Sequence, residues 1–143
     1  MTTAYDPDNV FAKILRGEIP AHRVFEDADT LAFMDVMPQA EGHTLVIPKA
    51  PARGLLDAES ASLASTMATV QRVARAVKTA FRADGLTILQ YNEPAGGQTV
   101  FHLHVHILPR HTGVALTGHT GRMAEPIQLA EHAARIRKVL EAG

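Results

Sequence analysis

The stretch HLHVHIL at residues 102–108 decides the fold of this chain, because histidines and apolar residues alternate in it without a break. Successive side chains of a β-strand point to opposite faces, so the pattern predicts a strand with histidines on one face and apolar residues on the other. In a helix, His102 and His106 would share a face while His104 pointed elsewhere. We therefore predict a strand over about residues 100–108, with its apolar residues in the core.

Hydrophobic periodicity and turn residues divide the rest of the chain into short strands and helices. Apolar residues recur every three or four positions over about residues 60–83, which predicts a long helix with one buried face. That face would consist of Leu63, Met67, Val70, Val73, Val77 and Phe81. Shorter helices are expected over residues 10–16 and from Pro126 onward, and further strands over residues 22–26, 30–35, 43–47 and 86–92. The class is α+β, with consecutive strands forming an antiparallel meander.

The composition is that of one globular domain over residues 1–143, with 46% hydrophobic and 20% charged residues. The 14 basic and 15 acidic residues nearly cancel, so no global positive charge would attract nucleic acid or an anionic membrane. The absence of cysteine excludes disulfides, thiolate catalysis and cysteine-ligated zinc. No secretory signal and no stretch long enough for a membrane span is found, so a cytoplasmic location is expected.

A row of histidines on one strand face could bind a metal, support the structure or catalyse a reaction. Alternate side chains of a strand lie about 6.7 Å apart, whereas a Zn–N bond measures about 2.0 Å, so one straight strand cannot bring three histidines to one ion without severe strain. A structural role suits a single histidine better than three in strict alternation. Neutral imidazole can attack phosphorus, and the phospho-histidine so formed divides one displacement into two. The pattern therefore favours catalysis.

The loop before this strand suits an anion. Gly96 and Gly97 allow backbone N–H groups to approach a phosphate closely, and Gln98 and Thr99 add side-chain donors. A Gly-Gly pair is more often a plain turn, so the loop supports phosphate binding only together with the histidines.

The alternating heptad resembles the signature of the histidine-triad (HIT) family, in which apolar residues separate three histidines. Residues 102–108 satisfy every position of that signature. The resemblance covers about residues 8–110 in the family's order, and residues 111–143 form a tail that matches it weakly. Its further segments are residues 11–21, 31–35, 42–49, 92–93 and 96–100.

The resemblance implies a fold and a mechanism. The fold is a five-stranded antiparallel sheet with one long central helix and short N-terminal and C-terminal helices, paired as a homodimer. His104 would be the nucleophile that forms a nucleotidyl-histidine, oriented and polarised by His102 and His43. His106 and Thr99 would meet the phosphate and the leaving group.

The resemblance also implies a substrate pocket. Asn92 and Gln98 would hold phosphate oxygens, and Asp35 would bind the ribose hydroxyls. The nucleoside pocket would be lined by Val10, Phe11, Ile14, Phe33 and Val36. Taken singly, each apolar residue could equally belong to an ordinary core, and Asp35 could cap a turn.

Many relatives carry a structural zinc ion, from which this chain departs. The ligands in those relatives are two N-terminal cysteines, a histidine after the Ile-Pro-Lys strand and the first triad histidine. Asn9, Ala12 and Pro51 stand at the first three positions here, so we expect neither a metal nor any other cofactor. The histidines outside the proposed site are expected to be solvated: His22, His111, His119 and His132.

The leading hypothesis is a nucleotidyl hydrolase or transferase that acts at the α-phosphate of a purine nucleotide conjugate. The conjugate could be a phosphoramidate or a dinucleoside polyphosphate, and the sequence does not choose between them. The alternative is a nucleotide-binding signalling module whose catalysis is incidental. Expected partners are the purine nucleotide and a second copy of the chain, with no nucleic acid and no membrane.

Overall fold

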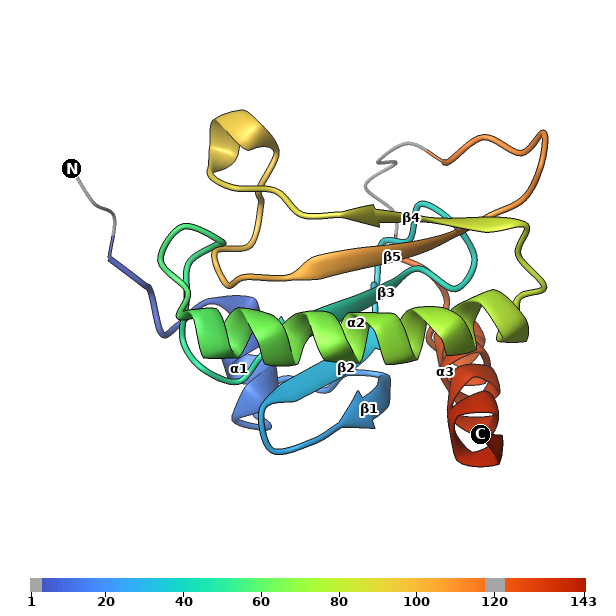
Figure 1. Ribbon diagram of the computed structural model, residues 1–143, viewed down its shortest axis with the longest axis horizontal. Helices are drawn as coiled ribbons and strands as arrows, with labels where there is room; N and C mark the ends of the chain where they lie inside the picture. Colours follow the sequence, from blue (N-terminus) through green and yellow to red (C-terminus); the bar gives the residue numbers. More distant parts are fainter. Residues whose placement is uncertain (1–3, 118–122) are drawn as a thin grey trace.

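The computed structural model describes residues 4–117 and 123–143 as a five-stranded antiparallel sheet with helices packed on it (Figure 1). The strands are β1 (Arg23–Glu26), β2 (Thr30–Met34), β3 (Thr44–Pro48), β4 (Gly85–Leu89) and β5 (Val105–Arg110). The helices are α1 (Val10–Leu15), α2 (Ser60–Ala80) and α3 (Pro126–Ala142), with a short 3₁₀ turn, η1, at Pro94–Gly96. The predicted fold class is confirmed. None of the helices among the described residues has the length and apolar character needed to cross a bilayer.

The strand order is β1-β2-β3-β5-β4, which differs from the expected meander. The last strand is inserted between β3 and β4, so His106 lies opposite Leu45 on one side and opposite Leu89 on the other. The histidine-bearing strand is therefore paired along both edges, and β4 is left at the edge of the sheet.

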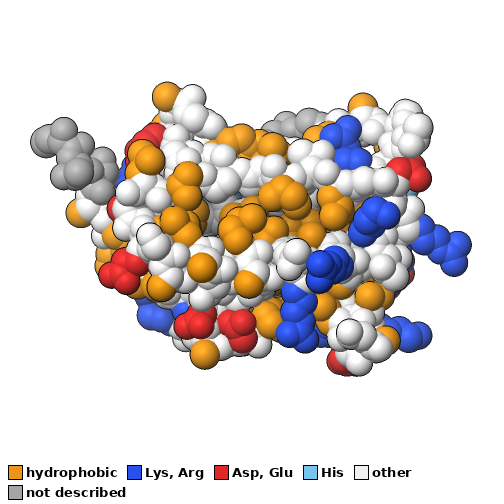
Figure 2. All heavy atoms as spheres, in the orientation of Figure 1, with side chains coloured by type: hydrophobic (Ala, Val, Ile, Leu, Met, Phe, Trp, Pro, Cys, Tyr) orange, Lys and Arg blue, Asp and Glu red, His pale blue; other side chains and the backbone are white. Residues whose placement is uncertain are grey.

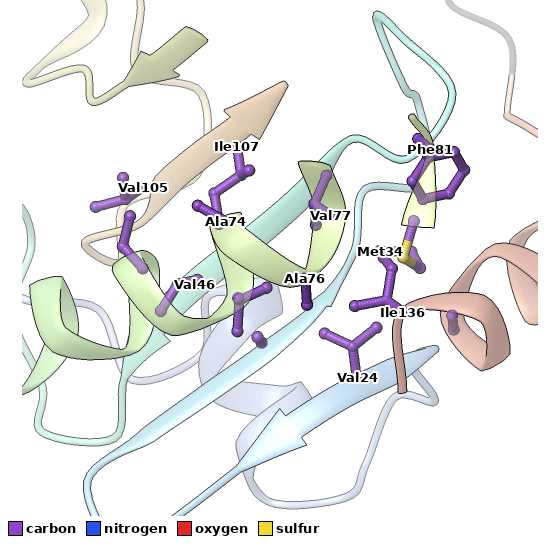
Figure 3. Packing of buried hydrophobic residues seen from close by; sticks show 14 of the residues in the cluster. Val24, Met34, Val46, Ala74, Ala76, Val77, Phe81, Val105, Ile107 and Ile136 are labelled. Atoms are coloured by element: carbon purple, nitrogen blue, oxygen red, sulfur yellow. The ribbon is translucent and has the colours of Figure 1, made fainter. Parts of the chain in front are cut away.

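Two hydrophobic cores occupy the two faces of the sheet. The larger core lies beneath α2 and α3 and includes Val46, Val105 and Ile107 (Figure 3). The smaller core packs α1 onto the opposite face through Phe11, Ile14, Leu31, Phe33, Leu45 and Ile47. Because neighbouring residues of a strand face opposite ways, His106 shares the α1 face while the residues on either side of it hold the α2 face.

Local interactions explain where the elements begin and end. Asn9 caps α1, since its Oδ1 accepts a hydrogen bond of 2.9 Å from the Ala12 N–H. The histidine strand begins at Val105, later than expected, because the Leu103 N–H donates instead to the Ala52 carbonyl at 2.9 Å. β4 ends at Leu89, where its register with β5 ends.

The buried stripe of α2 is rotated relative to the predicted one. Met67 is 50% exposed, and Thr66 and Thr69 are buried on that half of the helix instead. The Thr69 hydroxyl shares a hydrogen bond of 2.7 Å with the Thr30 hydroxyl, which satisfies both polar groups in the core. Hydrophobicity alone could not predict this, because the threonines depend on each other as partners.

The expectation that His132 is solvated was wrong. Its side chain is only 6% exposed, and its ring stands edge-on to Phe81 with centroids 5.1 Å apart. His111 is half-buried and donates from Nε2 to the Phe81 carbonyl at 2.9 Å. His22 is half-buried, and His119 lies outside the described residues.

Candidate active site

The triad histidines stand at the start of β5, beside α1. His102 and His104 precede the regular strand, and His106 is its second residue. His102 and His104 are buried, while His106 is half-buried. The rings of His104 and His106 have centroids 5.0 Å apart, so adjacent members of the row can act on one substrate group.

His104 has a defined tautomer. Its Nδ1 lies 2.7 Å from the backbone carbonyl of His102, and a carbonyl can only accept, so Nδ1 carries the proton. The lone pair of the ring is therefore on Nε2. Burial lowers the pKa of His104, and the bond to the His102 carbonyl and the nearby Asp35 carboxylate offset this only in part. The geometry presents a neutral imidazole with a nucleophilic Nε2.

His43 and His106 form a hydrogen bond whose donor and acceptor can be assigned. The Gln39 backbone N–H donates to His43 Nδ1 at 3.1 Å, so the proton of neutral His43 must be on Nε2. That nitrogen lies 2.9 Å from His106 Nδ1 and 3.4 Å from an Asp35 carboxylate oxygen. His43 thus donates to His106 Nδ1, and the remaining proton of His106 is on Nε2. The arrangement makes His106 Nε2 a hydrogen-bond donor.

An apolar cavity of about 480 Å³ opens beside these histidines. Its polar lining includes His104, His106, Thr99 and Asp35. The five apolar residues predicted for a nucleoside pocket all line it: Val10, Phe11, Ile14, Phe33 and Val36. Phe11 stands edge-on to the His104 ring, with centroids 4.9 Å apart and planes at 88°. α1 therefore forms one wall of the cavity and contacts the His104 ring directly.

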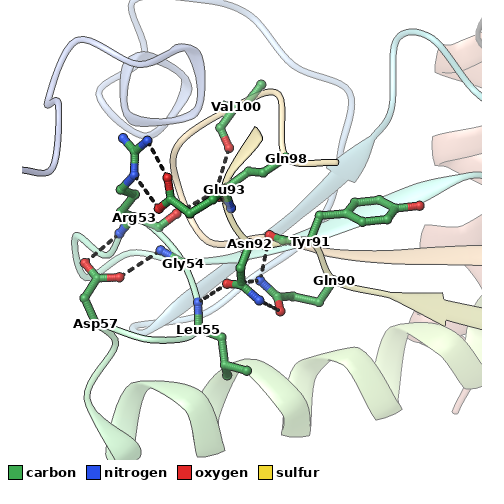
Figure 4. A network of polar contacts seen from close by, with 10 residues as sticks. All are labelled: Arg53, Gly54, Leu55, Asp57, Gln90, Tyr91, Asn92, Glu93, Gln98 and Val100. Atoms are coloured by element: carbon green, nitrogen blue, oxygen red, sulfur yellow. Dashed lines mark hydrogen bonds and ion pairs between the residues drawn. The ribbon is translucent and has the colours of Figure 1, made fainter. Parts of the chain in front are cut away.

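Asn92 and Gln98 are outside the residues that line this cavity. Gln98 is buried, and its amide donates to the carbonyls of Arg53 and Val100 at 2.7 and 3.0 Å (Figure 4). Its Oε1 accepts from the Glu93 N–H at 2.7 Å. Asn92 accepts from the Leu55 N–H at 2.8 Å. Both side chains thus hold the loop between β4 and β5 in place.

An ion pair braces the same loop from outside (Figure 4). Arg53 donates to both carboxylate oxygens of Glu93, at 2.8 and 2.9 Å, and this contact lowers the pKa of Glu93. Glu93 has a φ of 65°, a conformation that is unfavourable for a non-glycine residue. The surrounding hydrogen bonds fix this turn, and with it the position of Thr99 further along the loop.

Residues 16–113 match the family described as the HIT domain. The chain belongs to the HIT domain family. A crystal structure of a HIT-like protein from Bartonella henselae, described as involved in cell-cycle regulation, is 52% identical with a TM-score of 0.90, covering 95% of this chain and 99% of that one. A HIT-like protein of Mycobacterium tuberculosis is 42% identical over 114 residues, which is 80% of this chain and 79% of the relative.

One curated relative carries the name of an activity. Adenylylsulfatase HINT3 of Arabidopsis thaliana is 37% identical over 103 residues. The alignment covers 72% of this HIT protein and 52% of the plant protein. The plant protein is therefore the longer chain, and it shares the HIT segment with this one.

Sequence reasoning missed the rim of the cavity. Met37 and Met123 line it, and both are exposed, Met123 to 69%. The tail reaches this place because the Ala124 N–H donates to the Val36 carbonyl at 2.8 Å, and the Thr117 N–H to the Gln39 carbonyl at 2.8 Å. No periodicity or motif marks these backbone contacts, so the part of the tail near the cavity could not be found from the sequence.

Three side chains near the cavity lie close enough together to be considered as a metal site. Asp35, His43 and His106 offer ligand atoms within 4.8 Å of one another. However, the Gln39 N–H occupies His43 Nδ1, so an ion on His43 Nε2 would need the ring to lose its only proton. His102, the family's zinc ligand, has both ring nitrogens in hydrogen bonds. These residues fit a chain of proton donors better than a resident ion.

Buried histidines make the stability of the fold depend on pH. Burial lowers the pKa values of His102, His104 and His132, so the unfolded chain takes up protons first as the pH drops. More protons on the unfolded state means that the free energy of unfolding falls once the pH drops below the ordinary histidine value of about 6.5. We expect the urea midpoint to fall between about pH 7.5 and pH 5.5.

The variant His132→Gln isolates the contribution of His132 to the pH dependence of stability. It removes a buried histidine outside the cavity, so the decrease in urea midpoint between these pH values should become smaller while turnover stays intact. A urea midpoint that is independent of pH in this window would contradict the burial of these rings.

Proposed function

We propose that this HIT protein is a nucleotidyl hydrolase or transferase acting at the α-phosphate of a purine nucleotide conjugate, through a nucleotidyl-histidine on His104. One observation carries the proposal. His104 lines the apolar cavity while its Nδ1 proton is committed to a backbone carbonyl, which leaves the Nε2 lone pair as its reactive atom. The relative named as an adenylylsulfatase supports an adenylyl group as the transferred unit.

The cavity supports a nucleoside as the bound group. It is deep, mostly apolar and walled by the aromatic rings of Phe11 and Phe33, which suits a flat purine. Asp35 lies at the end nearer the histidines, where a carboxylate can accept hydrogen bonds from ribose hydroxyls. One Asp35 oxygen already accepts from the Met37 N–H at 2.8 Å, so its side chain is held ready for the sugar.

The reaction we propose has two displacements. The His43–His106 pair first takes up one proton from the solvent. His104 Nε2 attacks the α-phosphorus, the N–P bond forms, and the bond to the leaving group breaks as His106 Nε2–H gives it a proton, which returns the pair to its neutral form. Water then attacks the phosphorus, His106 takes up the proton that water loses, and the N–P bond breaks. His43 supports both steps, because the Asp35 carboxylate, 3.4 Å from its Nε2, stabilises the protonated pair before the first step and again after the second.

The loop residues complete the site in this proposal. Thr99 meets a phosphate oxygen with its hydroxyl. Gln98 already uses its amide for two backbone carbonyls, so its contacts favour a supporting role over direct phosphate binding. Asn92 would act together with Gln98 to hold the loop that carries Thr99.

Turnover of defined conjugates tests the function. A model adenosine phosphoramidate and a diadenosine polyphosphate are incubated separately with the enzyme, and AMP release is followed by chromatography, with His104→Ala as the blank. The proposal expects AMP from at least one of them, and the preferred substrate identifies the leaving-group class. Tight nucleotide binding without turnover of either would favour the signalling module and contradict the enzymatic proposal.

We also propose that two copies pair through α2 and β4. Figure 2 shows hydrophobic side chains gathered on this face of the molecule. An apolar groove runs along it, lined by Leu55, Leu63, Met67, Ile88 and Leu103 among others. β4 is an edge strand, and an edge strand beside an apolar surface is suited to pairing with an identical strand about a two-fold axis.

A charge in the groove should separate the copies. Ile88 is 41% exposed on β4, so Ile88→Asp would bury a carboxylate in the interface. We expect light scattering to give the mass of two chains for the wild type and of one chain for the variant at micromolar concentration. Ile127→Asp is the matched control, because Ile127 is exposed on α3, away from the groove. A monomeric wild type, or equal dissociation in the control, would refute this interface.

A further inference from the structure

The first triad histidine forms hydrogen bonds through both ring nitrogens. His102 is fully buried, and its Nε2 lies 2.8 Å from the Pro48 carbonyl, so Nε2 carries the proton. Nδ1 then holds the lone pair, and the Tyr5 hydroxyl lies 2.6 Å from it as the donor. The two rings also meet edge to face, with centroids 5.6 Å apart. The His102 ring is therefore fixed between the N-terminal segment and the end of β3.

The backbone of the same residue fixes the nucleophile. The His102 carbonyl accepts the Nδ1 proton of His104 at 2.7 Å. Because the ring and the carbonyl belong to one residue, a ring anchored at both nitrogens restricts movement of the backbone of residue 102, and with it movement of the carbonyl. The Tyr5 hydroxyl is thus connected to the His104 ring through two hydrogen bonds, one to the His102 ring and one from His104 to the His102 carbonyl.

Tyr5 is itself held in place by the turn that follows it. The Asp6 side chain accepts from the Asp8 N–H at 2.8 Å, and the Asn9 side chain donates to the Asp6 carbonyl at 2.7 Å. This turn leads directly into α1, which places Phe11 against the His104 ring. One short segment therefore contacts both His102 and His104.

We propose that Tyr5 is a positioning residue for nucleotidyl transfer. Its hydroxyl anchors the His102 ring on the side opposite Pro48, which holds the backbone of residue 102 where its carbonyl accepts the Nδ1 proton of His104, and so it keeps the lone pair of His104 on Nε2. This inference rests on the proposed function of His104 as the nucleophile. Nothing in the proposed chemistry requires Tyr5 to touch the substrate, and Tyr5 is not among the residues that line the cavity.

The test is Tyr5→Phe in the full chain, which removes the hydroxyl and keeps the ring. We expect kcat to fall by about tenfold to a hundredfold, by analogy with the loss of an outer hydrogen-bond partner of a metal-binding histidine, while KM stays unchanged. Val73→Ala is the stability control, since Val73 is buried in the core on the opposite face of the sheet. An unchanged kcat in Tyr5→Phe, or an equal fall in Val73→Ala, would overturn the inference.

Nitrogen NMR of histidine-labelled protein gives a readout that needs no substrate. In the wild type, His104 should show a protonated Nδ1 and an unprotonated Nε2, and His102 the reverse. In Tyr5→Phe, the His102 Nδ1 signal should shift and His104 should become a mixture of tautomers. The NMR result does not depend on turnover. If no conjugate were turned over, the proposed function would be refuted, but the effect of Tyr5 on the tautomer of His104 would still be established. A protonated His102 Nδ1 in the wild type would refute it without any variant.

Discussion

Replacing His104 by alanine should lower kcat by about 10⁴-fold or more, as expected when the group that forms the covalent intermediate is removed. Nucleotide binding should stay within a few-fold of the wild type, because the cavity walls come mainly from α1, β2 and the turn after it. Turnover is followed by AMP release and binding by calorimetry. His22→Ala is the matched control, since this half-buried histidine does not line the cavity.

The stereochemistry at phosphorus tests the same role independently. Two in-line displacements invert the α-phosphorus twice, so a chiral substrate should give a product of retained configuration. A nucleotidyl-histidine should also be trapped, labile to acid and resistant to base, in a peptide that contains His104. Inversion at phosphorus, or near-normal turnover by His104→Ala, would refute the mechanism and leave the family assignment untouched.

Replacing His106 by alanine should produce a loss that depends on the leaving group. Its Nε2–H supplies a proton to the departing atom, and such assistance is worth about 10²-fold to 10⁴-fold. From a 4-nitrophenyl ester of AMP, the leaving group is 4-nitrophenolate, which departs without taking up a proton, so turnover of this ester should be little affected. An adenosine phosphoramidate with an aliphatic amine needs the proton and should show the full loss.

The two substrates serve as internal controls for one another in the His106→Ala variant. Both use the same cavity and the same nucleophile, so damage to either would slow them equally. A loss of the same size with both leaving groups would show that His106 positions the phosphate instead of donating a proton. His22→Ala should turn over both substrates at wild-type rates.

The triad strand and the apolar residues that line the cavity were the most predictable parts of the molecule. Alternation along residues 102–108 placed Val105 and Ile107 in the core, as the structure confirms. It did so because a strand has a period of two and the other face of this strand is buried under a helix. The start of the strand was less predictable, since the Ala52 carbonyl competes for the Leu103 N–H and lies far away in sequence.

The hydrogen-bond partners of the histidines could not be predicted. The direction of the pair from His43 to His106 follows from the Gln39 backbone N–H, and a backbone contact leaves no mark in residue type. The contact of Tyr5 with His102 joins residues 97 positions apart. His132 was misjudged for a similar reason, because its burial depends on Phe81 at the far end of α2. Residue types identified the chemistry, and long-range contacts set the protonation states.

The two faces of β5 have different uses, one for the hydrophobic core and one for the histidines, and this bears on how such proteins diverge. Val105 and Ile107 are embedded beneath α2, so the spacing of the histidines between them is inherited from the packing of the core. Moving one histidine would require rebuilding the interior. Met37 and Met123 at the cavity rim are exposed and carry no such constraint. Within this lineage we therefore expect substrate range to drift readily by substitution at the rim, while the reaction type stays the same.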